Sequence, residues 1–173
     1  MPEPLAITKL KQNSDNREYV LDAVKTNGKL LEFASEHLKD DRQIVLEAVN
    51  NNAEALEFAS DKLKSDKEIV YNSVSKLGWT YCYAKDNLLS DKDLLIAGLQ
   101  KSGQILYFAH PELRDNKDGV ITAVKNKGII IKYASSRLRD DKDVALEAMK
   151  QDKSCYMFLG EHIKQDEDIL NLK

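Results

Sequence analysis

The chain has 173 residues, with 26 basic and 29 acidic side chains and a net charge of −3, a balance that argues against bulk affinity for nucleic acid. Its seven glycines and three prolines are too few for a collagen-like or disordered chain. No stretch approaches the ~20 consecutive apolar residues of a membrane span, and two cysteines are too few for a disulfide framework.

Residues 1–15 come before a repeat and fit it poorly, so we interpret them as an irregular N-terminal cap. The start, Met1-Pro2-Glu3-Pro4, lacks the basic and apolar segments of a secretory signal, and we expect a cytoplasmic protein. Export by a route that needs no signal peptide stays open as an alternative.

Residues 16–165 form six repeats of 25 residues, and residues 166–173 begin a seventh that we interpret as a C-terminal capping stub. Every start is Asp or Asn: Asn16, Asp41, Asp66, Asp91, Asn116, Asp141 and Asp166. These side chains suit the N-cap of a helix, whose apolar residues follow at i, i+3 and i+4. We predict one domain overall.

About ten residues after the first helix begins, four repeats carry a glycine. We interpret it as the residue that ends the helix with a positive φ angle. The turn glycines are Gly28, Gly78, Gly103 and Gly128. A second, shorter helix follows, and a serine after its Ala is expected to cap a short final turn (Ser35, Ser60 and Ser135).

The second helix carries two columns that we assign to the core. The aromatic column is Phe33, Phe58, Tyr83, Phe108, Tyr133 and Phe158, and the aliphatic column is Leu38, Leu63, Leu88, Leu113 and Leu138. Each helix–turn–helix unit is too small to bury its own apolar face, so stacking must hide that face. We therefore predict an all-α solenoid of helical hairpins, an α-α superhelix without right-angle crossings.

The second repeat reads Asp41 to Val49 as DRQIVLEAV and Ala55 to Ser60 as ALEFAS. This pattern resembles the short helical repeat named domain of unknown function 4116, whose unit looks like two of our repeats in tandem. The resemblance implies an all-helical repeat that is common in bacteria, including secreted effectors, and in some protists. It implies no catalytic residue and no ligand.

Catalytic and cofactor chemistry finds little support in the pattern. His37, His110 and His162 fall in different repeats, and Cys155 has no third group specified to orient His162. The segment from Asp115 to Gly119 resembles a calcium loop, but Lys117 occupies a ligand position. We expect no enzyme, no metal and no cofactor.

Basic residues recur in two columns, which leaves a nucleic-acid reader open as the alternative function. The columns are Lys39, Lys64, Arg114, Arg139 and Lys164, and Arg17, Arg42, Lys67, Lys92, Lys117 and Lys142. Acidic neighbours favour a solvated edge of alternating charge, and we expect no aromatic side chains interleaved with it.

Columns that vary between repeats indicate a surface. The column after the glycine and the column three residues later turn apolar in repeats three to six, at Trp79, Cys82, Tyr107, Ile129 and Met157. We predict a monomeric protein-binding scaffold that uses this stripe, because Trp and Tyr are typical anchors of interfaces. If Trp79 were core, the acidic residues Glu32, Glu54 and Glu57 would become the candidate surface.

Overall fold

The computed structural model describes residues 5–173, and every regular element in that range is helical. The chain divides into two compact units, the first ending at Leu88 and the second running from Leu89 to Lys173. The prediction of a single domain stays a prediction. No helix in the described part of the chain is long and apolar enough to cross a bilayer.

Unit 1 contains α1 (Leu5–Gln12), α2 (Arg17–Thr26), η1 (Gly28–Phe33), α3 (Glu36–Lys39), α4 (Arg42–Asn51), η2 (Ala53–Phe58), η3 (Leu63–Ser65), α5 (Lys67–Lys76) and η4 (Gly78–Tyr83). The element η5 (Asp86–Ser90) spans the division. Unit 2 contains α6 (Lys92–Leu99), η6 (Gly103–Phe108), η7 (Leu113–Asp115), α7 (Lys117–Asn126), η8 (Gly128–Tyr133), α8 (Ser136–Arg139), α9 (Lys142–Gln151), η9 (Lys153–Phe158), η10 (Ile163–Gln165) and α10 (Glu167–Leu172).

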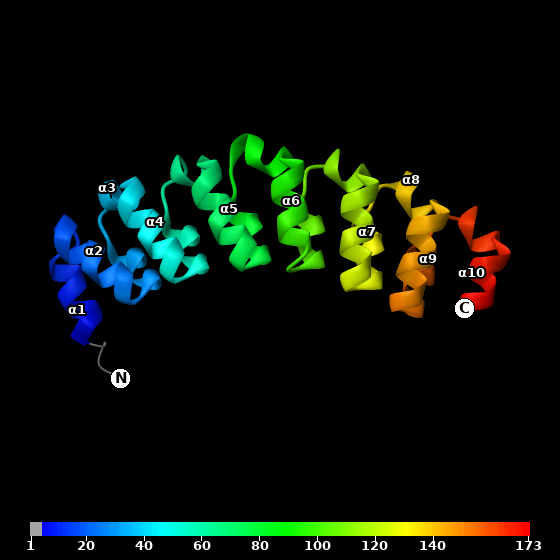
Figure 1. Cartoon of the computed structure of the whole chain (residues 1–173), viewed down its shortest axis with the longest axis horizontal. Helices are drawn as coiled ribbons and strands as arrows, with labels where there is room; N and C mark the ends of the chain where they lie inside the picture. The colour runs from blue at the N-terminus through cyan, green and yellow to red at the C-terminus, as the bar shows by residue number, and fades with distance from the viewer. Residues whose placement is uncertain (1–4) are drawn as a thin grey trace. The chain divides into compact units, whose positions relative to one another are not determined.

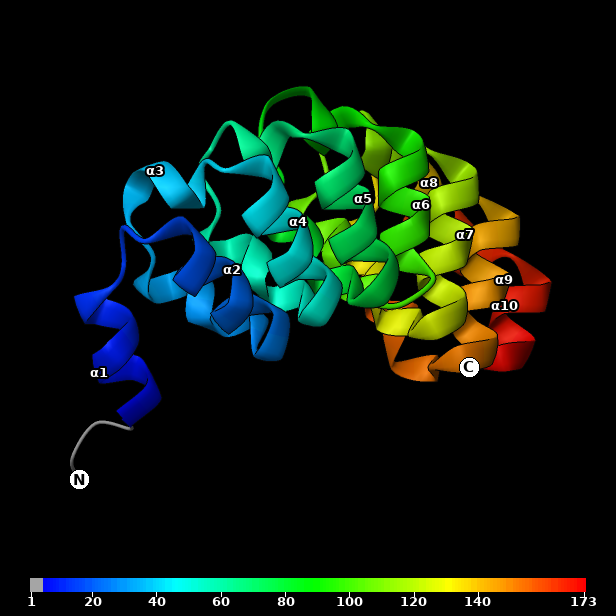
Figure 2. The ribbon, with the colours of Figure 1, turned by 60° about the vertical axis from the view of Figure 1, so that its left-hand side comes forward.

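Each unit is a stack of repeats with two layers. In unit 1 the helices α2, α4 and α5 lie side by side, and η1, η2 and η4 pack against one another in a second layer (Figures 1 and 2). Unit 2 repeats this arrangement with α6, α7, α9 and α10, and with η6, η8 and η9. The predicted helical-repeat solenoid is confirmed.

The Asp or Asn at each repeat start is the N-cap of its helix, as predicted. Asp41 accepts hydrogen bonds from the amides of Gln43 and Ile44 at 3.0 and 3.1 Å. The same capping bond occurs at all seven starts. Each cap satisfies an amide at the helix N-terminus that has no partner within the helix.

The second helix of each repeat differs from the prediction because it is a six-residue 3₁₀ helix followed by a third short helical turn. Ser60 and Ser135 cap that turn, since each hydroxyl accepts an amide bond at 3.2 Å. Ser35 makes no such bond. The N-terminal cap also differs, because residues 5–12 form the regular helix α1, which packs against η1.

The prediction that the glycines end helices with positive φ angles is wrong. In the described residues no glycine has a positive φ, and this includes Gly28, Gly78, Gly103 and Gly128. Each of these glycines instead begins a 3₁₀ helix. A Cβ at Gly103 would lie 2.8 Å from the Ala123 carbonyl oxygen of the next repeat, and one at Gly128 would overlap the Ala148 oxygen. Close approach of two backbones therefore requires glycine at these positions.

The assignment of the aromatic column to the core is also wrong, whereas the aliphatic column is buried as predicted. In this column Phe108 is exposed, and the other rings are only half-buried: Phe33, Phe58, Tyr83, Tyr133 and Phe158. Residues three apart in a 3₁₀ helix share a face. Gly28, Leu31 and Ala34 therefore face the core together, and Phe33 lies off that face.

Candidate functional site

The five residues predicted to bind a partner fall into both units. Trp79 and Cys82 belong to unit 1, where both are half-buried. The Trp79 ring meets Tyr83 edge-on, with centroids 5.4 Å apart. Burial raises the pKa of the Cys82 thiol. The Trp79 side chain is thus neither fully buried nor largely exposed, and its role in binding a partner stays a prediction.

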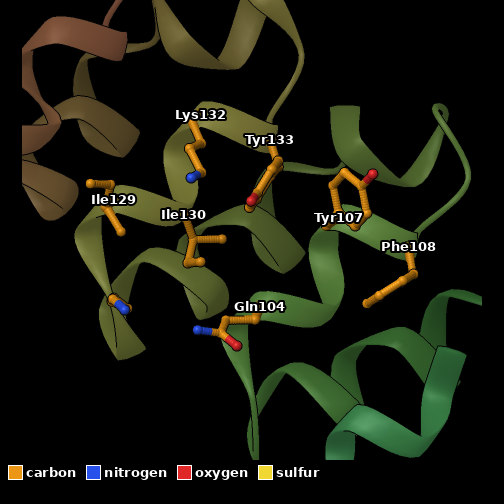
Figure 3. A pocket seen from close by; sticks show the side chains of 8 residues that line it. Gln104, Tyr107, Phe108, Ile129, Ile130, Lys132 and Tyr133 are labelled. Atoms are coloured by element: carbon orange, nitrogen blue, oxygen red, sulfur yellow. The ribbon is translucent and has the colours of Figure 1, made fainter.

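The other three predicted residues lie in unit 2, where two of them line one hollow. Tyr107 and Met157 are 53% and 69% exposed, and Ile129 is half-buried. A hollow of about 300 Å³ is lined by Gln104, Tyr107, Phe108, Lys127, Ile129, Ile130, Lys132 and Tyr133 (Figure 3). Met157 lines a different hollow.

The aromatic column forms part of this surface. The centroid of the Tyr107 ring lies 5.1 Å from that of Phe108 and 5.2 Å from that of Tyr133, which belongs to the next repeat. Lys132 extends over the Tyr133 ring, with its Nζ 4.8 Å from the centroid (Figure 3). Phe108 is 49% exposed, so its assignment to the core had hidden a surface residue.

Two further hollows continue this surface, each sharing residues with the one before it. One, of about 350 Å³, shares Tyr107, Lys132 and Tyr133 with the first and adds Arg114 and Arg139. Another, of about 280 Å³, shares Arg139 with the second and includes Met157 and Phe158. We name this surface the aromatic–cation face, defined as Tyr107, Phe108, Arg114, Ile129, Lys132, Tyr133, Arg139, Met157 and Phe158.

Three cations of this face form no ion pair with a carboxylate in the described residues: Arg114, Lys132 and Arg139. Arg114 donates to the backbone carbonyls of Ala109 and Tyr107, at 2.9 and 2.7 Å. The Arg139 Nε atom is buried and has no hydrogen-bond partner. A buried donor without an acceptor is costly, and the remaining N–H groups of the Arg139 guanidinium are free to donate to an anionic group.

The other basic column is neutralised by the next repeat. Lys117 Nζ lies 2.9 Å from an Asp141 oxygen and 2.7 Å from an Asp143 oxygen. Lys142 pairs in the same way with Asp166 and Asp168. Arg17, Arg42 and Lys92 also pair with carboxylates of the following repeat. These cations are occupied by their own chain, which argues against a phosphate-binding edge.

A serine, a histidine and an aspartate meet in unit 1, but their geometry differs from that of a catalytic triad. The Ser35 hydroxyl lies 3.1 Å and an Asp15 carboxylate oxygen 3.0 Å from the same His37 nitrogen, Nδ1. In a triad the two partners contact opposite ring nitrogens, so that the base is oriented by one and acts on the other. The cluster cannot relay a proton in that way.

Neither thiol is set up as a nucleophile, and no metal site is found in the described residues. Burial raises the pKa of the Cys155 thiol to about 11, so the thiolate that acts as the nucleophile is scarce at neutral pH. Groups of three His, Cys, Asp or Glu side chains suited to a metal ion are absent from the described part of the chain.

Comparison with known families matches the chain to the model described as a domain of unknown function (DUF4116). It matches in tandem over residues 16–64, 66–114 and 116–170. The chain belongs to the DUF4116 family. Each matched segment begins at a repeat start and covers two 25-residue repeats, and the third continues to residue 170 in the stub, which confirms the predicted tandem unit. No curated protein and no solved structure matches the chain.

The sequence of this DUF4116 chain showed the residues of the face but placed them in separate columns. Arg114 and Arg139 stood in a basic column, Lys132 in a variable one, and Phe108 in the core. The expectation that aromatic residues do not interleave with basic ones is wrong here, because Tyr107, Tyr133, Arg114 and Arg139 line one hollow. Contacts between successive repeats bring them together.

Proposed function

We propose that this chain is a non-catalytic protein-binding scaffold and that the aromatic–cation face of unit 2 is its contact surface. The observation that carries the proposal is a group of exposed aromatic and Met side chains beside arginines that lack carboxylate partners. Tyr and Arg are the residues most often found at the energetic centre of interfaces. Helical repeat stacks commonly present such surfaces to other proteins.

The predicted nucleic-acid reader is the weaker candidate for this chain. It relied on the basic columns, and five members of one column are paired with carboxylates of the next repeat. A role as an exported bacterial effector, which the resemblance implied, stays a prediction.

Capture from an extract of the cell that makes the protein, followed by mass spectrometry, tests the proposal. The baits are the wild type, Tyr107→Ser and the control Tyr71→Ser. Tyr71 is exposed on α5 in unit 1 and lines none of the three hollows. The proposal expects a protein retained by the wild type and by Tyr71→Ser but lost with Tyr107→Ser, and then bound by the purified wild type. Identical capture by all three baits would contradict it.

A further inference from the structure

We infer that the aromatic–cation face binds an extended acidic peptide segment of a partner protein. Carboxylates of that segment would bind Arg114, Lys132 and Arg139, and an apolar side chain would enter the hollow beside Tyr107. This inference rests on the proposed function, because it names the chemistry of the partner that the scaffold would bind.

Charge is the first argument. The residues lining the three hollows include five cations and one acid, Glu161, although the chain as a whole has a net charge of −3. That acid pairs with Lys164 at 2.8 Å, and no carboxylate of the described residues forms an ion pair with Arg114, Lys132 or Arg139. Positive potential concentrated on one face of an acidic chain favours an anionic ligand.

Arg139 gives the second argument. Its buried Nε has no acceptor, and its side chain lines two neighbouring hollows. A guanidinium offers parallel donors that match the two oxygens of a carboxylate. No hydrogen bond within the described residues engages this guanidinium, so a ligand carboxylate at the junction of the two hollows would bind its terminal nitrogens, beyond the buried Nε.

Spacing is the third argument, and it favours an extended ligand. The hollows are built from η6, η8 and η9, which belong to successive repeats. Packed helices lie ~8–10 Å apart. A polyproline-type segment brings every third residue to the same side at ~3.1 Å per residue, or about 9 Å. Acidic residues at every third position would therefore meet Arg114 in the fourth repeat and its equivalent Arg139 in the fifth, with Lys132 beside them.

The orientation of the rings favours a peptide over a single-stranded nucleic acid. Base binding relies on open aromatic faces on which successive bases stack. Here one face of Tyr133 carries the Lys132 ammonium, and the Tyr107 ring is tilted by 60° to Tyr133. These rings form walls of a hollow instead of a row of parallel platforms.

Fluorescence anisotropy with the full chain tests the inference. The probe is a labelled peptide of about twelve residues repeating Glu-Pro-Leu, which favours the extended form at ~3.1 Å per residue. The matched peptide repeating Gln-Pro-Leu has the same shape without the charge. We expect the Glu peptide to bind at least about tenfold more tightly, with an affinity that falls as salt is added.

Variants assign the binding to the face. Arg139→Gln and Lys132→Gln should each weaken binding of the Glu peptide about tenfold. Lys125→Gln should leave it unchanged, because Lys125 is exposed on α7 and lines none of the three hollows. Thermal melts check folding, and the exposed Lys132 provides the decisive variant if Arg139→Gln unfolds.

Three results would overturn the inference. They are equal binding of the Glu and Gln peptides, no effect of Lys132→Gln, and tight binding of an oligouridylate probe in place of the Glu peptide. If neither peptide binds while Tyr107→Ser still loses a cellular partner, the acidic-ligand inference fails and the scaffold proposal stands. If that partner is also absent, both fail.

Discussion

Single residues in these repeats follow the three-residue turn of the 3₁₀ helix. Glycine, the aliphatic residue three positions later and the alanine after three more share the buried face, as at Gly103, Leu106 and Ala109. The large ring beside that alanine lies off the face. A buried position and an aromatic identity are thus separate properties in this fold.

Truncating Leu106 and Phe108 should therefore give opposite results. Leu106 is fully buried, and Leu106→Ala should lower the free energy of unfolding by ~2–5 kcal/mol because it leaves a cavity. Phe108→Ala removes a half-exposed ring and should cost less than about 1 kcal/mol. Urea denaturation measures both. A larger loss for Phe108→Ala would restore the aromatic column to the core.

Alanine substitutions test whether these glycines are needed for the close approach of two backbones or for their conformational freedom. Gly128→Ala should destabilise the protein more than Gly103→Ala, because its Cβ would overlap the Ala148 carbonyl oxygen, whereas the corresponding contact at Gly103 is 2.8 Å. Gly119→Ala is the control, since its Cβ meets only ordinary contacts with Asn116 and Leu99 and should be neutral or stabilising by up to ~1 kcal/mol. Equal thermal shifts at all three positions would contradict this ordering.

At the level of the helices, one carboxylate both caps its own helix and binds the preceding repeat. The Asp141 carboxylate accepts hydrogen bonds from the backbone amides of Asp143 and Val144 and forms an ion pair with Lys117. Burial raises the pKa of Asp141, but the hydrogen bonds from Lys117 and the amides outweigh this and hold it below its ordinary value. The helix start is therefore joined to the repeat before it.

Replacing Asp141 separates the cap from the charge. Asp141→Ala should cost ~0.5–2 kcal/mol of unfolding free energy because the amides of α9 lose their acceptor. Asp141→Asn keeps an acceptor, as the natural Asn116 does at the start of α7, and should cost under about 1 kcal/mol through the lost ion pair. Thermal melts at low and high salt compare them. Equal losses for the two variants would show that charge dominates.

Polar side chains also donate hydrogen bonds to the C-terminal carbonyls of the helix in the preceding repeat. The Asn51 amide donates to the Lys25 carbonyl at 2.9 Å, and Asn126 donates to the Leu99 carbonyl at 2.7 Å. Lys76 reaches the carbonyls of Val49 and Asn50 from the same place in its repeat. Each satisfies carbonyls left open at a helix C-terminus, so one repeat completes the hydrogen bonding of the one before.

Over the whole chain, recurrent carboxylates make stability depend on acid pH. Hydrogen bonds from Lys142 lower the pKa of Asp166, and those from Ser135 and Arg137 lower the pKa of Asp115. Ser60 and Lys62 do the same for Asp40. Each carboxyl binds fewer protons in the folded than in the unfolded chain, so the free energy of unfolding rises with pH across the range in which these carboxyls titrate.

Acid titration checks that sign. The contribution should be fully present above the unfolded pKa of about 3.9 and lost as pH falls through the lower folded values. The melting temperature should therefore change little from neutral pH to about 5 on account of these groups and drop below about 4. Asp166→Asn should flatten the drop. A chain that gains stability on acidification below that point would contradict the assignment.

The features of this protein that depend on residues close together in the chain could be predicted from its sequence. The 25-residue period, the N-caps and the buried aliphatic column depend on neighbours within one repeat, so spacing and residue type suffice to predict them. The role of the glycines and the exposure of the aromatic rings depend on how closely successive layers approach and on the choice of a 3₁₀ helix. The aromatic–cation face required the folded structure, because Tyr107, Lys132 and Arg139 meet only when layers from different repeats stack.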